Sequence, residues 1–163
     1  PVSQVPITLA LIERLLARYP RIVAGVKDSS GDWSNTRAMI ERFAPQGFRV
    51  FSGSETFLLA TLRAGGAGCI SATANVNPAA IARLAREWQS GEAETLQQAL
   101  DRVRGAFQQV PMIGALKAAI AHFGSDPAWN TVRPPLTQLA PAQQAQLLTA
   151  LDAIGFAMPG LAA

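Results

Sequence analysis

Three short apolar runs alternate with helical patterns between residues 22 and 89, and this alternation limits the possible folds most strongly. The runs lie at residues 22–27, 48–51 and 68–71, and turn-forming residues flank each of them. Runs of about four to six apolar or β-branched residues with such flanks are typical of buried strands. Strands that alternate with helices form βαβ units, which build a parallel sheet. The chain is therefore predicted to be an α/β protein.

Helical spacing of apolar residues predicts the elements around these strands. Helices are expected at residues 8–19, 33–44, 55–64 and 78–89. Asp32 or Ser34 can cap the helix at 33–44, and Pro78 suits the first turn of the helix at 78–89. After Gly91 the pattern changes to helices at 92–109, 111–123 and 141–154, with no strand between them. We therefore expect an α/β part over residues 1–91 and a helical region over residues 92–163.

Lys27 ends the first predicted strand, directly before the loop at residues 28–32. Ligands of α/β proteins bind at that carboxyl end of the strands. One interpretation is that the lysine stem lies along the sheet edge and the ammonium reaches water. The other is a desolvated amine: burial disfavours the charged form, and the neutral amine can attack a carbonyl to form a Schiff base. The position alone does not decide between the two.

The composition of the chain limits the classes of partner that it can have. Of the 163 residues, 49% are hydrophobic and 15% are charged, which suits one globular domain with a sizeable core. The net charge is +3, but the basic residues are scattered singly, so we expect no nucleic-acid partner. No apolar run approaches the ~20 residues needed to cross a bilayer, so we expect no membrane partner. Cys69 is the only cysteine, which fits a cytoplasmic protein.

Four regions, in the same order along the chain, resemble the dihydrodipicolinate synthase / N-acetylneuraminate lyase family of class I, pyruvate-dependent aldolases. They are residues 25–31 (GVKDSSG), 51–55 (FSGSE), 65–76 (GGAGCISATANV) and the pair 116–118 (LKA) with 132–136 (VRPPL). The first resembles the family's Schiff-base lysine motif. The resemblance implies the C-terminal part of a TIM (β/α)8 barrel, about three parallel strands with helices, plus a C-terminal helical bundle.

The resemblance also implies roles for five residues. Lys27 would be the catalytic nucleophile that forms an imine with the keto group of pyruvate or a related 2-keto acid. Gly53 and Ile70 would line the pyruvate with backbone groups. Ser71 would place a hydroxyl near the substrate, and Glu55 would contact the second substrate, an aldehyde. Each of these last four also has a plain structural alternative, such as a turn glycine or a charge that favours a helix start.

The expected enzyme is a Schiff-base lyase or aldolase, or a dehydratase, that acts as a homo-oligomer. Because the lysine itself is the electron sink, the resemblance implies no metal and no organic cofactor. His122 has no partner at metal-ligand spacing, so no zinc site is predicted.

The sequence departs from the family in places that matter for chemistry. The family's catalytic tyrosine would lie just before Pro1, and its Thr/Ser pair further upstream. Residues 1–4 lack the arginine of true dihydrodipicolinate synthases, and Thr56 stands where sialic acid lyases tend to have a second acidic residue. We therefore assign no substrate specificity within the family, and we expect poor turnover by this chain alone. The alternative is a catalytically silent half-barrel that acts only in self-association or in assembly with a missing N-terminal half.

Overall fold

The computed structural model describes residues 5–161, and the chain divides into two compact units, Pro1–Ser71 and Ala72–Ala163. In the second unit, helix α4 (Pro78–Glu87) packs against helix α5 (Ala93–Gln108), and the division expected after residue 91 stays a prediction. Of the part of the chain that is described, no helix is long and apolar enough to span a membrane.

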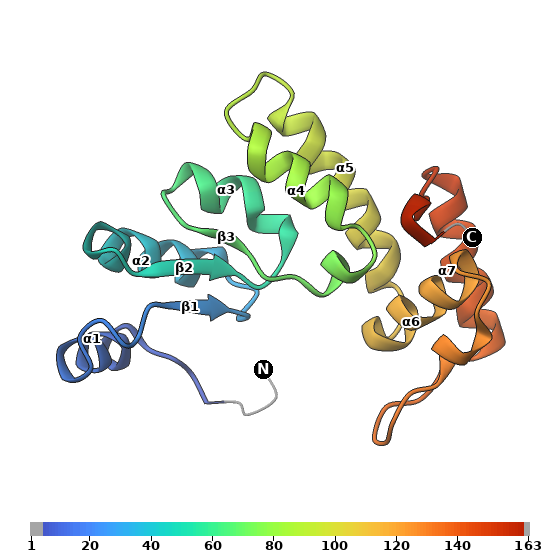
Figure 1. Ribbon diagram of the computed structural model, residues 1–163, viewed down its shortest axis with the longest axis horizontal. Helices are drawn as coiled ribbons and strands as arrows, with labels where there is room; N and C mark the ends of the chain where they lie inside the picture. Colours follow the sequence, from blue (N-terminus) through green and yellow to red (C-terminus); the bar gives the residue numbers. More distant parts are fainter. Residues whose placement is uncertain (1–4, 162–163) are drawn as a thin grey trace. The chain divides into compact units, whose positions relative to one another are not determined.

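The first unit alternates helices and strands, as the sequence pattern predicts (Figure 1). Its three strands form one parallel sheet in the order β1-β2-β3. The α/β prediction is therefore confirmed. The elements of this unit are α1 (Leu9–Arg18), β1 (Gly25–Asp28), α2 (Trp33–Phe43), η1 (Ala44–Gln46), β2 (Arg49–Ser52), η2 (Glu55–Phe57), α3 (Leu58–Arg63) and β3 (Gly68–Cys69).

Local signals set the ends of these elements. Asp32 caps α2, since its carboxylate accepts a hydrogen bond from the Ser34 N–H at 2.8 Å. Gly47 precedes β2 with φ of 84°, and Gly65 follows α3 with φ of 88°, values that favour glycine. The turns that separate strand from helix are therefore fixed by residue type.

One face of the sheet is covered by α1 and α2. Val50 on β2 is fully buried between these helices and the sheet, and Val26 on β1 packs against the same cluster. The buried members of this cluster are Ile12, Met39, Ile40, Phe43, Phe48 and Val50. This core fixes the strands from one side.

The strand predictions were wrong in three respects. The first strand begins at Gly25 instead of residue 22, because Ile22 lies in the preceding turn with 76% of its surface exposed. It is also not a buried strand, because Gly25 and Lys27 are exposed. The third strand is limited to Gly68–Cys69, so Ile70 and Ser71 lie in its exit loop.

The second unit is helical over its described residues, in agreement with the pattern seen after Gly91. Its main core lies between α5, α6 (Met112–Phe123) and α7 (Pro141–Ala153), where Phe107, Leu147 and Leu151 are fully buried. Asn77 precedes α4 but makes no capping hydrogen bond with its side chain. Besides α4 and α5, the elements are η3 (Ala72–Asn75), α6 (Met112–Phe123), η4 (Pro127–Asn130), α7 (Pro141–Ala153) and η5 (Pro159–Leu161).

Candidate active site

Lys27 lies in the sheet one residue before the end of β1. Parallel pairing places it opposite Phe51 on β2, and Phe51 opposite Gly68 on β3. These three residues, here called the Lys27 row, therefore cross the sheet on one face. Lys27 is exposed, and within residues 5–161 its ammonium makes no ion pair or hydrogen bond. The row thus presents a free primary amine at the carboxyl end of the sheet.

Gly53 holds the exit of β2 against the exit of β1. Its N–H donates a hydrogen bond to the Asp28 carbonyl at 2.6 Å. A Cβ atom at this position would lie 2.7 Å from the same carbonyl oxygen and 2.8 Å from the Ser29 Cα. Only glycine therefore fits here without a backbone shift. Gly53 is a close-packing glycine, and its predicted backbone contact with a ligand stays a prediction.

Ile70 extends the same region from β3. Its N–H donates to the Ser52 carbonyl at 2.9 Å, which continues the pairing between strands beyond the end of β3. Its side chain is 47% exposed, which is unusual for a large apolar residue in a packed barrel core. Side chains alternate along an extended segment, and Gly53 and Ile70 each lie two residues after a member of the Lys27 row. Both positions therefore lie on the same face of the sheet as that row.

Glu55 and Ser71 form a separate buried pair. The Ser71 hydroxyl donates a hydrogen bond to the Glu55 carboxylate. Ser71 is only 8% exposed and Glu55 only 1%. Glu55 is the first residue of η2, so its charge also lies at a helical N-terminus. Both side chains are thus engaged with the protein, and their predicted contacts with substrate stay predictions.

Asp28 is a residue of the site that the sequence analysis missed. It was placed in the exit loop, but it is the last residue of β1 and is only 8% exposed. Its carboxylate accepts four hydrogen bonds: from the Ser30 N–H and hydroxyl, both at 3.0 Å, from the Asn35 amide at 3.0 Å, and from the Thr36 hydroxyl at 2.6 Å. The available signal was an Asp followed by Ser at the second position, a common side-chain-to-backbone turn.

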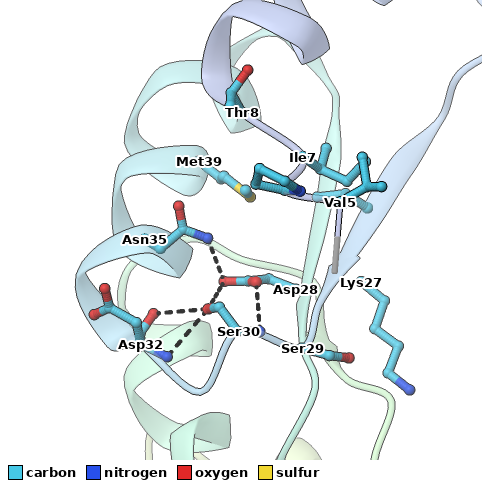
Figure 2. Close-up of a pocket in the computed structure, with 12 residues that line it drawn as sticks. Val5, Ile7, Thr8, Lys27, Asp28, Ser29, Ser30, Asp32, Asn35 and Met39 are labelled. Carbon is cyan, nitrogen blue, oxygen red and sulfur yellow. Dashed lines mark hydrogen bonds between the residues drawn. The ribbon is translucent and has the colours of Figure 1, made fainter. Parts of the chain in front are cut away.

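Within the described residues, all hydrogen-bond donors to the Asp28 carboxylate are neutral groups. Burial would raise the pKa of Asp28, but the hydrogen bonds from Thr36, Ser30 and Asn35 outweigh burial and bring the pKa below its usual value. Asp28 therefore stays ionised without a cationic partner. Figure 2 shows the Lys27 side chain extending away from Asp28 and its partners.

A cavity of about 750 Å³ lies beside β1 in the first unit (Figure 2). Its walls come from the segment at residues 5–8, from β1 and its exit loop, and from α2. Lys27 contributes to this wall, as do the polar residues Asp28, Ser30 and Asn35. Lys27 and the Asp28 network therefore border the same cavity, although the Lys27 side chain extends away from Asp28 and its partners.

Cys69 is a poor nucleophile in this setting. Burial, and then the negative charge of Glu55, raise the pKa of its thiol to about 11. The thiolate is therefore scarce at neutral pH. Cys69 is therefore not a candidate nucleophile.

Known proteins resemble the chain over most of its length. The model of the dihydrodipicolinate synthetase family matches residues 1–154. A protein named as an uncharacterized DapA-like lyase, from Chloroflexus aurantiacus, is 35% identical over 158 residues, which cover 94% of this chain and 50% of that protein.

Solved structures agree. The dihydrodipicolinate synthase of Agrobacterium tumefaciens superposes with a TM-score of 0.81 at 29% identity, over 94% of this chain and 50% of that one. YagE, a prophage protein of the dihydrodipicolinic acid synthase family from E. coli K12 whose structure holds pyruvate, gives a TM-score of 0.79 at 30% identity, over 90% and 51% of the two chains. The chain thus spans about half the length of the relatives it matches.

Proposed function

Because this chain belongs to the dihydrodipicolinate synthetase family, we propose that it carries the imine-forming lysine of a lyase that acts on pyruvate or a related 2-keto acid. The observation that carries the proposal is the placement of Lys27. It lies next to the carboxyl end of β1, where ligands of α/β proteins bind, and it faces an open side of the sheet. The pyruvate held by YagE supports a 2-keto acid as the substrate class.

The proposed chemistry follows from the amine. Its neutral form attacks the keto carbon to give a carbinolamine, which takes up a proton from the solvent and loses water, so the imine that remains carries a proton on nitrogen. That cation accepts electrons from the neighbouring carbon, so a carbanion forms there once a proton or a carbon group departs. The carbanion then adds to an aldehyde, or the same steps run in reverse to cleave the bond. A dehydratase would use the same imine to expel a hydroxide.

The proposal extends to the fold and assembly of the whole enzyme. We propose that the three parallel strands are part of a (β/α)8 barrel, that the helices after Gly91 form a C-terminal bundle, and that the assembled protein is a homo-oligomer. The family relatives, about twice as long as this chain, support the first point. Poor turnover by the chain alone remains the expectation.

A silent half-barrel is the second candidate. It is favoured by the edge position of β1 and by exposed apolar side chains in the first unit, Val5, Ile7 and Ile22. Such surfaces associate readily with other chains. In that case Lys27 would be an ordinary surface lysine.

Borohydride trapping separates the two candidates. The chain is incubated with pyruvate, borohydride is added, and the modified residue is located by peptide mass spectrometry. The sequence offers an internal control, because Lys117 is the only other lysine and its ammonium lies 5.0 Å from the centre of the Trp129 ring. A Lys27→Arg variant is the matched control, since a guanidinium stays protonated and forms no imine.

A pyruvate adduct on Lys27 that is absent from Lys117 and from the variant would support the lyase. An adduct that requires the amino-terminal half of a relative to be added would support the same chemistry, with the pocket completed by residues outside this chain. No adduct on Lys27 under either condition would overturn the proposal and favour the silent half-barrel.

A further inference from the structure

We infer that Asp28 is a positioning residue for Lys27, and that it acts by anchoring the end of β1 to α2 and to the exit of β2. The inference rests on the proposed function, since it concerns the same amine. Asp28 directly follows Lys27, and it is hydrogen-bonded to its own loop, to α2 and to the exit of β2.

The carboxylate makes the first part of the anchor. It holds the exit loop through two hydrogen bonds from Ser30, and it holds the first turn of α2 through Asn35 and Thr36. Hydrogen bonds to an ionised group are stronger than those between neutral groups. The 2.6 Å bond from the buried Thr36 hydroxyl is the shortest of the four.

The backbone carbonyl makes the second part. It accepts the Gly53 N–H at 2.6 Å, which joins the exits of β1 and β2. This contact depends on the missing Cβ of Gly53, since a side-chain atom there would lie 2.7 Å from the carbonyl oxygen. Asp28 is therefore fixed on three sides: by its loop, by α2 and by β2.

This anchor bears on Lys27 because the two residues share a peptide bond and point to opposite faces of the strand. The carboxylate is saturated by neutral donors, so it does not pair with the amine. It instead fixes the backbone from which the lysine side chain projects. Reactions that depend on oriented groups can lose about 100-fold in rate when a group is misplaced by about 1 Å.

Thr36 gives the cleanest test, because it touches Asp28 from another element. Thr36→Val keeps the shape of the side chain and removes the hydroxyl, whereas Thr36→Ser keeps the hydroxyl and removes a methyl group. Pyruvate adduct formation on Lys27 is measured by borohydride trapping over a range of pyruvate concentrations, in whichever mixture the unaltered chain reacts. Arg37→Ala is the control, since Arg37 lies next to Thr36 but pairs only with Glu41 on the surface.

We expect Thr36→Val to lower the maximal rate of adduct formation about 10- to 100-fold, with little change in the pyruvate concentration at half-maximal rate. Thr36→Ser should restore most of the rate, and Arg37→Ala should match the unaltered chain. Equal losses in the Val and Ser variants would mean that packing matters and not the hydrogen bond, which overturns the inference. So would an unchanged rate in the Val variant. If the unaltered chain forms no adduct on Lys27 in any mixture, the proposed function itself fails.

Discussion

At the scale of single residues, the candidate site depends on the alternation of side chains along β1. Lys27 projects from the uncovered face, and Asp28 projects into a network of hydrogen bonds with α2. The amine and the hydrogen-bond network are thus adjacent in the sequence but lie on opposite faces of the strand. Two predictions belong to this scale.

Replacement of Gly53 by alanine should destabilise the first unit by about 1–3 kcal/mol, because the new Cβ overlaps the Asp28 carbonyl. Gly105→Ala is the control. Gly105 lies inside α5 with no neighbouring atom within 4 Å of an added Cβ, so alanine there should stabilise the helix by about 0.5–1 kcal/mol. Urea unfolding measures both. Equal effects of the two variants would contradict the close approach at Gly53.

Asp28 should make stability depend on pH in the acid range. Its pKa in the folded chain lies below the ordinary value of 3.8, so the unfolded chain binds the proton more readily. The stabilisation is complete above pH 3.8 and is lost as the pH falls through the folded pKa. Asp28→Asn should therefore unfold at lower urea concentration at neutral pH and lose less stability on acidification.

Part of the acid dependence of stability should remain in the Asp28→Asn variant, because a second carboxylate contributes to it. The pKa of Asp32 is also lowered, by hydrogen bonds from Ser34, and it acts in the same direction. Identical acid dependence in the unaltered chain and the Asp28→Asn variant would show that the network does not hold an ionised carboxylate.

The sequence predicted Lys27 but not its support, for a physical reason. Lys27 belongs to a short local motif, whereas the Asp28 network needs Thr36, eight residues later in the next helix. The resemblance predicts a ligand contact for Gly53, but its packing against Asp28 depends on the pairing of two strands that are far apart in the sequence. Contacts between elements are set by folding and are not visible in a local pattern.

At the scale of elements, helices were easier to predict than strands. The apolar periodicity that predicted α1 also identifies the side chain that it buries, Ile12, which is 2% exposed. The strand ends were misplaced because a strand ends where hydrogen bonding to its neighbour ends, and hydropathy does not report this. Ile22 is apolar like a strand residue, yet it lies in a turn.

Ile12 and Ile22 make a matched pair for a prediction. Ile12→Ala should cost about 2–5 kcal/mol in unfolding free energy, because it leaves a cavity in the cluster shared with Met39 and Phe43. Ile22→Ala should change the unfolding free energy by less than about 0.5 kcal/mol, since Ile22 is 76% exposed. Chemical denaturation of both variants checks this. A large loss at Ile22 would mean that another surface covers it.

At the scale of the whole molecule, each compact unit has its own core. The first unit is built around Val50 and Phe43, and the second around Phe107 and Leu151. Leu151→Ala should therefore weaken the second unit by about 2–5 kcal/mol. Hydrogen exchange should show faster exchange in α5, α6 and α7. An equal increase in β1 and β2 would indicate that the units unfold together.

The edge position of β1 gives Lys27 a consequence that has nothing to do with catalysis. Within the described residues, no strand pairs with the outer edge of β1, and such edges invite other chains to add to the sheet. Two copies that paired there with Lys27 opposite Lys27 would bring two ammonium groups close together, and their repulsion opposes that pairing. The charge at position 27 therefore disfavours self-association through this edge, whether or not the amine reacts. An alanine at this position would remove both the charge and the proposed chemistry, whereas arginine removes only the proposed chemistry.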